Sequence, residues 1–194
     1  MKIILASGSK QRRDIFDYMG LKYEIVKSNI EEKSKYKMPN KYVMDLSRQK
    51  GLNVKNTINE KCLIISCDTI IYMNGKKYEE PKTKIEAKNN IKQMTGKTTY
   101  AYTGVTIIDT INNKEITYYD KAALKLRKNI TEEEIDWYIN NEENLLERCG
   151  YTILGKGIIF IDKVIGDYNT IFGLSASSLI KHLNELGYSV NDLM

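Results

Sequence analysis

The stretch LASGSKQRR at positions 5–13 has the residue types to bind an anion. Ser7 and Ser9 follow an apolar run, and Arg12 and Arg13 come directly after them. A strand that passes through small residues into a helix brings backbone N–H groups, hydroxyls and the positive helix end to one point. The two guanidinium groups add donors that suit phosphate oxygens. The pattern predicts a phosphate site, although a plain helix cap at Ser9 beside two solvated arginines fits these residues equally well.

A carboxylate interrupts a second stretch that is otherwise apolar or small. Asp68 lies in the middle of positions 63–71, in a strand that we expect to be buried. An unpaired charge there would be costly, so Asp68 should face a cation or a cleft. Enzymes that hydrolyse phosphates usually hold Mg²⁺ through one or two carboxylates. The pair Glu31-Glu32 is a weaker candidate because surface glutamates are common, and a strand end or loop cap at Asp68 is the structural alternative.

The histidine and cysteine content disfavours other chemistries. The single histidine, His182, lies in an apolar-periodic stretch, which favours a packed helix and disfavours a Ser-His-Asp or Cys-His hydrolase. Cys62, Cys67 and Cys149 form an odd set without a CxxC pair, so we expect buried thiols and no thiolate zinc site. The run Gly96-Lys97-Thr98 resembles the end of a P-loop but lacks its earlier glycine and precedes a strand pattern.

Strands and helices must alternate to position these residues. The hydrophobic pattern predicts strands at 2–5, 23–26, 62–73, 98–109, 115–127 and 157–164, and helices at 10–19, 39–51, 83–96, 131–140 and 175–186. Two helices open with a capping-box pattern, at Thr83 and Thr131. Asn74-Gly75 and Asn112-Asn113 are turn signals. We therefore expect an α/β fold with a mixed sheet that one hairpin interrupts.

Length and composition predict a single globular domain over residues 1–194. The chain is 42% hydrophobic and 28% charged, without long charged blocks. Its net charge of +5 fits an enzyme for phosphorylated substrates, a nucleic-acid binder or a basic protein of no special purpose. We expect no nucleic-acid partner, because the lysines of positions 33–41 are mixed with polar residues and with the adjacent Glu31 and Glu32, and no RNP-like aromatic cluster is present. We also expect no signal peptide or membrane span, and a cytoplasmic location.

Several segments together resemble one family. In order and spacing, the pieces ILASGSKQRRDIF, NIEEKSK, YVMDLSRQK, SCDTIIYMNGK, PKTKIEA, MTGKTTYAYTGV and GDYNTIFGL are similar to the Maf family, also called septum formation inhibitor Maf-like proteins. Each piece alone is weak, but their ordered combination over nearly the whole chain is specific.

The resemblance implies a fold and an activity. Maf proteins share an elongated, two-lobed α/β fold with inosine triphosphatases, with a central cleft. They hydrolyse nucleoside triphosphates between the α- and β-phosphates, releasing a monophosphate and pyrophosphate, with a divalent metal such as Mg²⁺, Mn²⁺ or Co²⁺. Members act on dTTP and UTP or on modified nucleotides, some restrain septum formation, and homodimers are usual, although this sequence shows no interface patch.

The resemblance also implies site residues by position. Ser7, Ser9 and Arg12 match the family's serine and arginine signature, and Glu32, Lys50, Asp68 and Thr69 fall on its functional positions; with Arg13 and Lys82 they complete the candidate set. Our hypothesis is that the two carboxylates hold the metal and orient or deprotonate the attacking water. Lys50, the arginines and the serine loop then bind the triphosphate and stabilise the leaving pyrophosphate.

Some positions depart from the family pattern. Glu80 stands where a lysine is usual, which leaves Lys82 as its replacement. The run 146–149, Leu-Glu-Arg-Cys, replaces Asp-Lys-Ala-Gly, and Leu154 replaces a glutamine or glutamate. Leucine cannot hydrogen-bond a base edge, so the preferred base stays open. A diverged, catalytically weak Maf-like protein that binds nucleotides and acts through partners in cell division is the alternative, but the costly Asp68 favours the enzyme.

Overall fold

The computed structural model describes residues 1–147 and 149–193, so Arg148 of the divergent run lies outside the described residues. The chain divides into two compact units. The first consists of Met1–Thr69, Tyr102–Lys121 and Asp167–Met194, and the second of Ile70–Ala101 and Ala122–Gly166. The two units carry different candidate residues.

The strands form a mixed sheet in the order β2-β1-β3-β5-β6-β7, with β4 paired to β3. Their bounds are β1 (Ile3–Leu5), β2 (Glu24–Ile25), β3 (Leu63–Met73), β4 (Lys76–Tyr78), β5 (Thr98–Asp109), β6 (Lys114–Leu126) and β7 (Ile161–Ile165). Strand β1 is parallel to β2 and β3, whereas β4 and β7 are antiparallel to their neighbours. The predicted mixed α/β class is confirmed.

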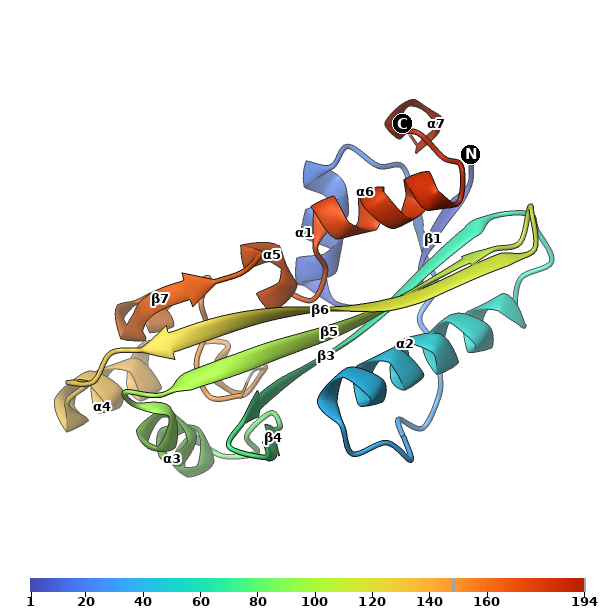
Figure 1. Cartoon of the computed structure of the whole chain (residues 1–194). Helices are drawn as coiled ribbons and strands as arrows, with labels where there is room; N and C mark the ends of the chain where they lie inside the picture. The colour runs from blue at the N-terminus through green and yellow to red at the C-terminus, as the bar shows by residue number, and fades with distance from the viewer. Residues whose placement is uncertain (148, 194) are drawn as a thin grey trace. The chain divides into compact units, whose positions relative to one another are not determined.

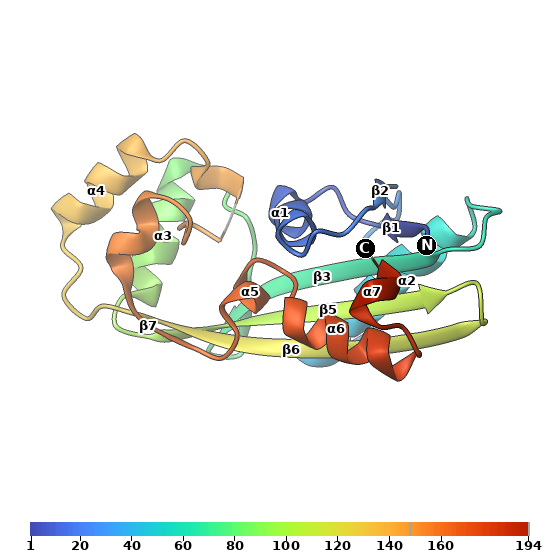
Figure 2. The same cartoon turned by 90° about the horizontal axis from the view of Figure 1, so that it is seen from above.

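Helices cover both faces of the sheet in the first unit. Helices α1 (Lys10–Tyr18) and α6 (Ala176–Glu185) lie on one side of the strands and α2 (Pro39–Lys55) on the other (Figure 1). The view from above places α2 behind the strands (Figure 2). Side chains alternate along β3, so Leu63, Ile65 and Cys67 pack against α1 and α6, while Ile64 packs in the cluster that contains Val54 of α2.

The second unit contains the two capped helices, α3 (Lys84–Met94) and α4 (Glu132–Asn141), with the 3-10 turns η1 (Leu145–Glu147) and η2 (Lys156–Phe160). The Thr83 hydroxyl accepts a hydrogen bond from the Glu86 N–H at 3.1 Å. Thr131 and Glu134 form a complete capping box, with reciprocal bonds of 3.2 and 2.9 Å. Both predicted helix starts are confirmed.

The structure corrects two predicted boundaries. The hydrophobic pattern predicts one strand over 157–164, but Lys156–Phe160 is a 3-10 turn. A Cβ on Gly157 would lie 2.4 Å from the Thr152 carbonyl oxygen, so the backbone folds tightly against Thr152 at this point and is not extended. Helix α2 continues past Gly51 to Lys55 because Gly51 is packed within the protein, where tertiary contacts outweigh its helix-ending tendency.

The sequence pattern does not predict two short helices, α5 (Tyr168–Ile171) and α7 (Val190–Leu193), because a single turn is too short for a periodic pattern. The three cysteines are free and buried, as expected. His182 packs against Tyr118 with ring centroids 3.8 Å apart, which agrees with a packed helix face. Within the described residues, no helix is both long and apolar enough to cross a membrane.

Candidate functional site

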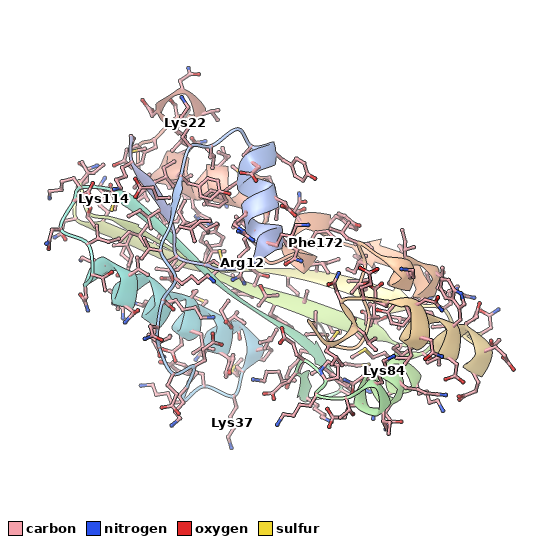
Figure 3. All side chains as sticks on the ribbon, turned by 180° about the vertical axis from the view of Figure 1, so that it is seen from behind. Arg12, Lys22, Lys37, Lys84, Lys114 and Phe172 are labelled. Carbon is pink, nitrogen blue, oxygen red and sulfur yellow. The ribbon has the colours of Figure 1, made fainter. Side chains whose placement is uncertain are left out.

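Arg12 is the centre of a polar cluster at the start of α1. Its Nη1 donates to Ser7 Oγ at 3.0 Å, its Nη2 to Thr69 Oγ1 at 3.0 Å, and its Nε to the Gly173 carbonyl at 3.1 Å. Figure 3 labels Arg12 and Phe172 beside the lower end of α1. A guanidinium group has five N–H donors. The other two have no acceptor, and no carboxylate neutralises Arg12, among the residues that the structure describes.

The first turn of α1 is open to an anion. Ser9 occupies the N-cap position, but its side chain makes no capping bond and donates instead to Gln11 Oε1 at 3.0 Å. The Ser9 N–H is turned toward Ser7 Oγ, 3.3 Å away. The first turn contains no acidic residue. Ser9 is thus the N-cap residue, but its side chain caps no backbone N–H. The N–H groups of the first turn that no described residue accepts, together with the helix dipole, favour a negative ligand here.

Lys50 holds two carboxylates on the other face of β3. Its Nζ lies 2.7 Å from Asp68 Oδ1 and 2.8 Å from Glu32 Oε1. The side chains of Lys50 and Asp68 are only 13% and 7% exposed, whereas Glu32 is 55% exposed. Asp68 Oδ2 is buried and has no hydrogen-bond partner in the described part of the chain. Since a buried carboxylate oxygen without a partner is costly, this atom suits a cation or a ligand proton.

Close packing of α2 on the sheet positions Lys50. A Cβ on Gly104 of β5 would lie 2.2 Å from the Val43 carbonyl oxygen, so only glycine allows α2 to approach this closely. Ser66 of β3 donates to the Ser47 carbonyl at 2.7 Å and ties the helix to the strand. Lys50 follows one turn later in α2 and reaches Asp68, two residues beyond Ser66.

One strand therefore carries both clusters. Asp68 and Thr69 are consecutive in β3, and consecutive side chains point to opposite faces. Asp68 contacts Lys50 of α2, and Thr69 contacts Arg12 of α1. The structure brings Ser7, Arg12 and Thr69 together in one cluster and Glu32, Lys50 and Asp68 in another.

Arg13 and Lys82 are two further residues that the sequence predicts to bind substrate. Arg13 Nε is buried, and no described residue accepts a hydrogen bond from it. Lys82 belongs to the second unit, where its side chain is exposed and its N–H donates to Glu86 Oε2 at 2.6 Å. The binding roles of both residues stay predictions.

Sequence reasoning missed three groups around Arg12: the Gly173 carbonyl, Thr103 and the Thr170 carbonyl. Thr103 Oγ1 lies 2.9 Å from Thr69 Oγ1 and donates to the Thr170 carbonyl at 2.9 Å. The available signal was a hydroxyl in a predicted strand, because a hydroxyl that a strand buries needs a hydrogen-bond partner. The carbonyl groups leave no signal in the sequence.

The carboxylate pair fits a divalent cation that substrate helps to hold. The described residues contain no group of three or more histidine, cysteine, aspartate or glutamate side chains suited to a metal. Mg²⁺ is commonly held by one or two carboxylates together with waters and substrate phosphates. Asp68 Oδ2, buried without a partner in the described part of the chain, and the nearby carboxylate of Glu32 meet that requirement.

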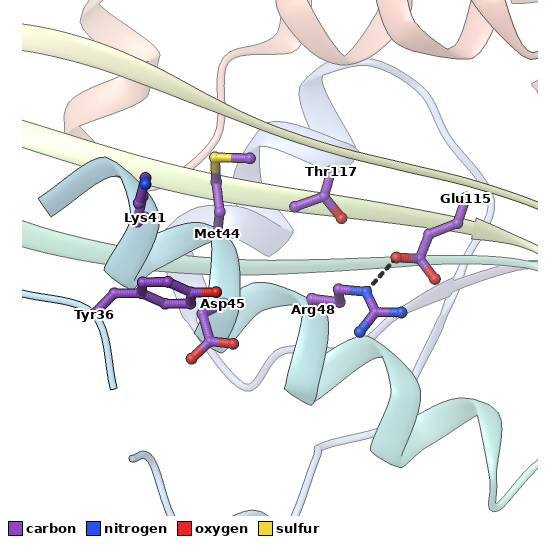
Figure 4. A pocket seen from close by; sticks show the side chains of 7 residues that line it. All are labelled: Tyr36, Lys41, Met44, Asp45, Arg48, Glu115 and Thr117. Carbon is purple, nitrogen blue, oxygen red and sulfur yellow. Dashed lines mark hydrogen bonds and ion pairs between the residues drawn. The ribbon is translucent and has the colours of Figure 1, made fainter. Parts of the chain in front are cut away.

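A separate hollow of about 450 Å³ lies beside α2 and β6 (Figure 4). It is lined by Tyr36, Lys41, Met44, Asp45, Arg48, Glu115 and Thr117. Arg48 Nε donates to Glu115 Oε1 at 2.6 Å, so the charge of Arg48 is neutralised within the hollow. None of the predicted site residues lines this hollow.

These features define an α/β protein with a helix start that suits an anion and a buried carboxylate–lysine cluster. The chain belongs to the Maf-like protein family, whose model matches residues 2–186. It is 36% identical over 179 residues to the dTTP/UTP pyrophosphatase of Thermoanaerobacter sp. (strain X514), covering 92% of this chain and 93% of the relative. It is also 36% identical over 190 residues to the dTTP/UTP pyrophosphatase of Bacillus anthracis, covering 97% of each chain.

A solved structure shows a more distant likeness. The nucleoside-triphosphatase, or dITP/XTP pyrophosphatase, of Mycobacterium abscessus is 8% identical and has a TM-score of 0.43, covering 97% of this chain and 99% of that one.

Proposed function

We propose that this protein is a nucleoside triphosphate pyrophosphatase, which hydrolyses a nucleotide between its α- and β-phosphates to a monophosphate and pyrophosphate. The proposal is supported by two relatives named dTTP/UTP pyrophosphatase that match nearly the full chain. The observation that carries it is Asp68, a carboxylate only 7% exposed that Lys50 holds through one oxygen while the other has no described partner. A protein without catalysis has little reason to keep such a group.

The triphosphate binds at the start of α1. Three of the five N–H donors of Arg12 bond to Ser7, Thr69 and Gly173, and the other two are offered to the phosphates. The backbone N–H groups of the first turn are further donors. Ser9, Arg13 and Lys82 are further ligands in this proposal. Phosphoryl transfer needs charge neutralisation and alignment more than a protein nucleophile. Donors placed before the reaction stabilise the leaving pyrophosphate as its negative charge develops.

The carboxylate cluster acts on the attacking water. Asp68 and Glu32 are the residues that would hold Mg²⁺, Mn²⁺ or Co²⁺, and a bound cation would supply neutralisation of phosphate charge. With Glu32, Asp68 orients or deprotonates the water that attacks the α-phosphorus, and Oδ2 is its available acceptor. Lys50 keeps Asp68 oriented through Oδ1.

Leu146 and Leu154 lie at positions that bear on base selectivity. We propose dTTP and UTP first, from the names of the relatives. Leu154 is 67% exposed and Leu146 is 43% exposed, and neither can hydrogen-bond a base edge. Modified nucleotides therefore belong in the substrate panel. We further propose a single-domain protein that works in the cytoplasm, where nucleoside triphosphates are found, and pairs as a homodimer.

A second candidate is a Maf-like protein that binds nucleotides without turnover and acts through partners. Glu80, Leu146 and Leu154, which depart from the family pattern, favour it. Pyrophosphate release from canonical and modified nucleoside triphosphates, with each of Mg²⁺, Mn²⁺ and Co²⁺, separates the two. Metal-dependent release by the wild type that Asp68→Asn abolishes supports the enzyme. Nucleotide binding by calorimetry without release would support the second candidate.

A further inference from the structure

Arg12 is connected by two routes of hydrogen bonds to α5 and the residues that follow it. Directly, Nε donates to the Gly173 carbonyl at 3.1 Å, across 161 positions of sequence. Indirectly, Nη2 donates to Thr69 Oγ1, which lies 2.9 Å from Thr103 Oγ1, and Thr103 donates to the Thr170 carbonyl. The two routes close a ring of hydrogen bonds around the guanidinium group, all within the first unit.

The hydrogen bond from Thr103 to the Thr170 carbonyl determines which hydroxyl donates at each step of the chain. A threonine hydroxyl carries one hydrogen. Thr103 uses that hydrogen on the Thr170 carbonyl, 2.9 Å away, so it can only accept from Thr69. Thr69 then donates its own hydrogen to Thr103 and presents a lone pair to Arg12 Nη2 at 3.0 Å. The chain therefore runs in one direction, from Arg12 through Thr69 and Thr103 to the Thr170 carbonyl.

We propose that Thr103 is a positioning residue that orients Arg12 for the triphosphate through Thr69. The proposal rests on the nucleotide pyrophosphatase activity proposed above and adds a residue with no ligand contact of its own. Thr103 is 0% exposed and Thr170 is 1% exposed, so the far half of the chain lies inside the protein. An arginine held in place before the ligand arrives loses less conformational entropy when it binds.

Removing the Thr103 hydroxyl breaks the chain in the middle. In Thr103→Val, the Thr69 hydrogen loses its acceptor and the hydroxyl is free to turn its hydrogen toward Arg12. The Thr69 oxygen then no longer has to present a lone pair to Arg12 Nη2. Without that acceptor, the guanidinium group keeps only its bonds to Ser7 and Gly173. Thr103→Ser keeps the hydroxyl and should keep the chain.

Thr106 offers a matched control on the same strand. It is also 0% exposed, and its hydroxyl also lies in a buried chain, 3.0 Å from Ser47 Oγ and 3.0 Å from Thr117 Oγ1. That chain leads to α2 and β6 and does not include Arg12. Thr106→Val therefore removes a comparable buried hydroxyl and carries a comparable stability cost, without touching the proposed route.

The kinetic test measures pyrophosphate release from dTTP and UTP. We expect Thr103→Val to lower kcat/KM about tenfold, through a higher KM and a lower kcat, because Arg12 contacts phosphates in the bound substrate and stabilises the leaving pyrophosphate. Thr103→Ser should restore most of the loss, and Thr106→Val should stay within about twofold of the wild type. In an Arg12→Lys background, Thr103→Val should add less than about twofold, whereas independent effects would multiply. Equal losses from the two valine variants, or multiplication with Arg12→Lys, would overturn the proposal.

A second readout needs no ligand. The Arg12 Nε–H resonance, assigned from its loss in Arg12→Lys, should be sharp in the wild type and in Thr106→Val, and broadened or shifted in Thr103→Val. An unchanged resonance in Thr103→Val overturns the positioning role. Absence of turnover in the wild type overturns the proposed function instead, and the resonance still decides whether Thr103 positions Arg12.

Discussion

Asp68 and Lys50 form an ion pair of 2.7 Å in which only one carboxylate oxygen is used, while Oδ2 stays buried without a described partner. Lys50 also holds Glu32 at 2.8 Å, so one cation serves two carboxylates. The pairing makes the buried charge of Asp68 tolerable and leaves a strong acceptor available for chemistry.

Replacing Asp68 with asparagine should stop turnover and leave the fold intact. The asparagine side chain would keep the shape and the polar contact with Lys50 but lose the charge and the basic oxygen. We expect kcat for pyrophosphate release to fall at least about a hundredfold, with a melting temperature near that of the wild type. Glu32→Gln, at a side chain 55% exposed, should lose less activity. Retained activity in Asp68→Asn would remove this carboxylate from the mechanism.

Lys50→Met should destabilise the protein by leaving Asp68 charged and unpaired inside. Breaking one partner of a buried pair costs about 3 kcal/mol or more. The double variant Lys50→Met/Asp68→Asn removes both charges and should recover much of that loss. Urea unfolding of the two single variants and the double variant gives the coupling energy. If the losses in unfolding free energy of the two single variants add up in the double variant, the interaction between Lys50 and Asp68 does not stabilise the protein.

Gly104→Ala tests the close approach of α2 to β5. The new Cβ would meet the Val43 carbonyl oxygen at 2.2 Å, and backbone atoms cannot move aside cheaply. We expect a loss of about 3 kcal/mol in the free energy of unfolding, at the upper end for overpacking. Gly187→Ala is the comparison: nothing lies within 4 Å of its Cβ, and only its φ of +97° adds strain, roughly 1–2 kcal/mol. A mild effect at Gly104 would show that α2 can shift on the sheet.

Stability should depend on pH through Asp109, which caps the turn after β5. Burial opposes its charge, but the backbone N–H and side-chain amide of Asn112 and the Tyr188 hydroxyl donate to it and lower its pKa. A lowered pKa in the folded state means that the stabilisation is fully present above the unfolded-state pKa of about 4 and is lost as pH falls through the folded-state value.

The measurement is the urea midpoint between about pH 6 and pH 2.5. The wild type should lose stability with acid more steeply than Asp109→Asn, which starts lower at neutral pH because a charged acceptor has been removed. Tyr188→Phe should show an intermediate slope. Parallel curves for the wild type and Asp109→Asn would assign the acid sensitivity to other carboxylates.

The local elements could be predicted from the sequence because their causes lie within a few residues. The Thr131 capping box involves neighbours three positions apart, and the turn at Asn74-Gly75 adopts positive φ angles of 52° and 79°, as its residue types favour. The burial of Asp68 follows from its apolar neighbours along one strand. The passage from β1 into α1 across positions 5–13 likewise follows from neighbouring residues, and the anion site predicted there stays a prediction.

By itself, the sequence determined the α/β class, most strands and helices, and the residue types of the candidate site. Only the tertiary structure decided which groups meet. The 3-10 turn at Lys156–Phe160 depends on the packing of Gly157 against Thr152, and the orientation of Arg12 depends on a carbonyl 161 positions away. The physical reason is range: turns, caps and side-chain alternation arise from neighbouring residues, whereas the bonds that hold Arg12 and Lys50 exist only once helices and strands have packed.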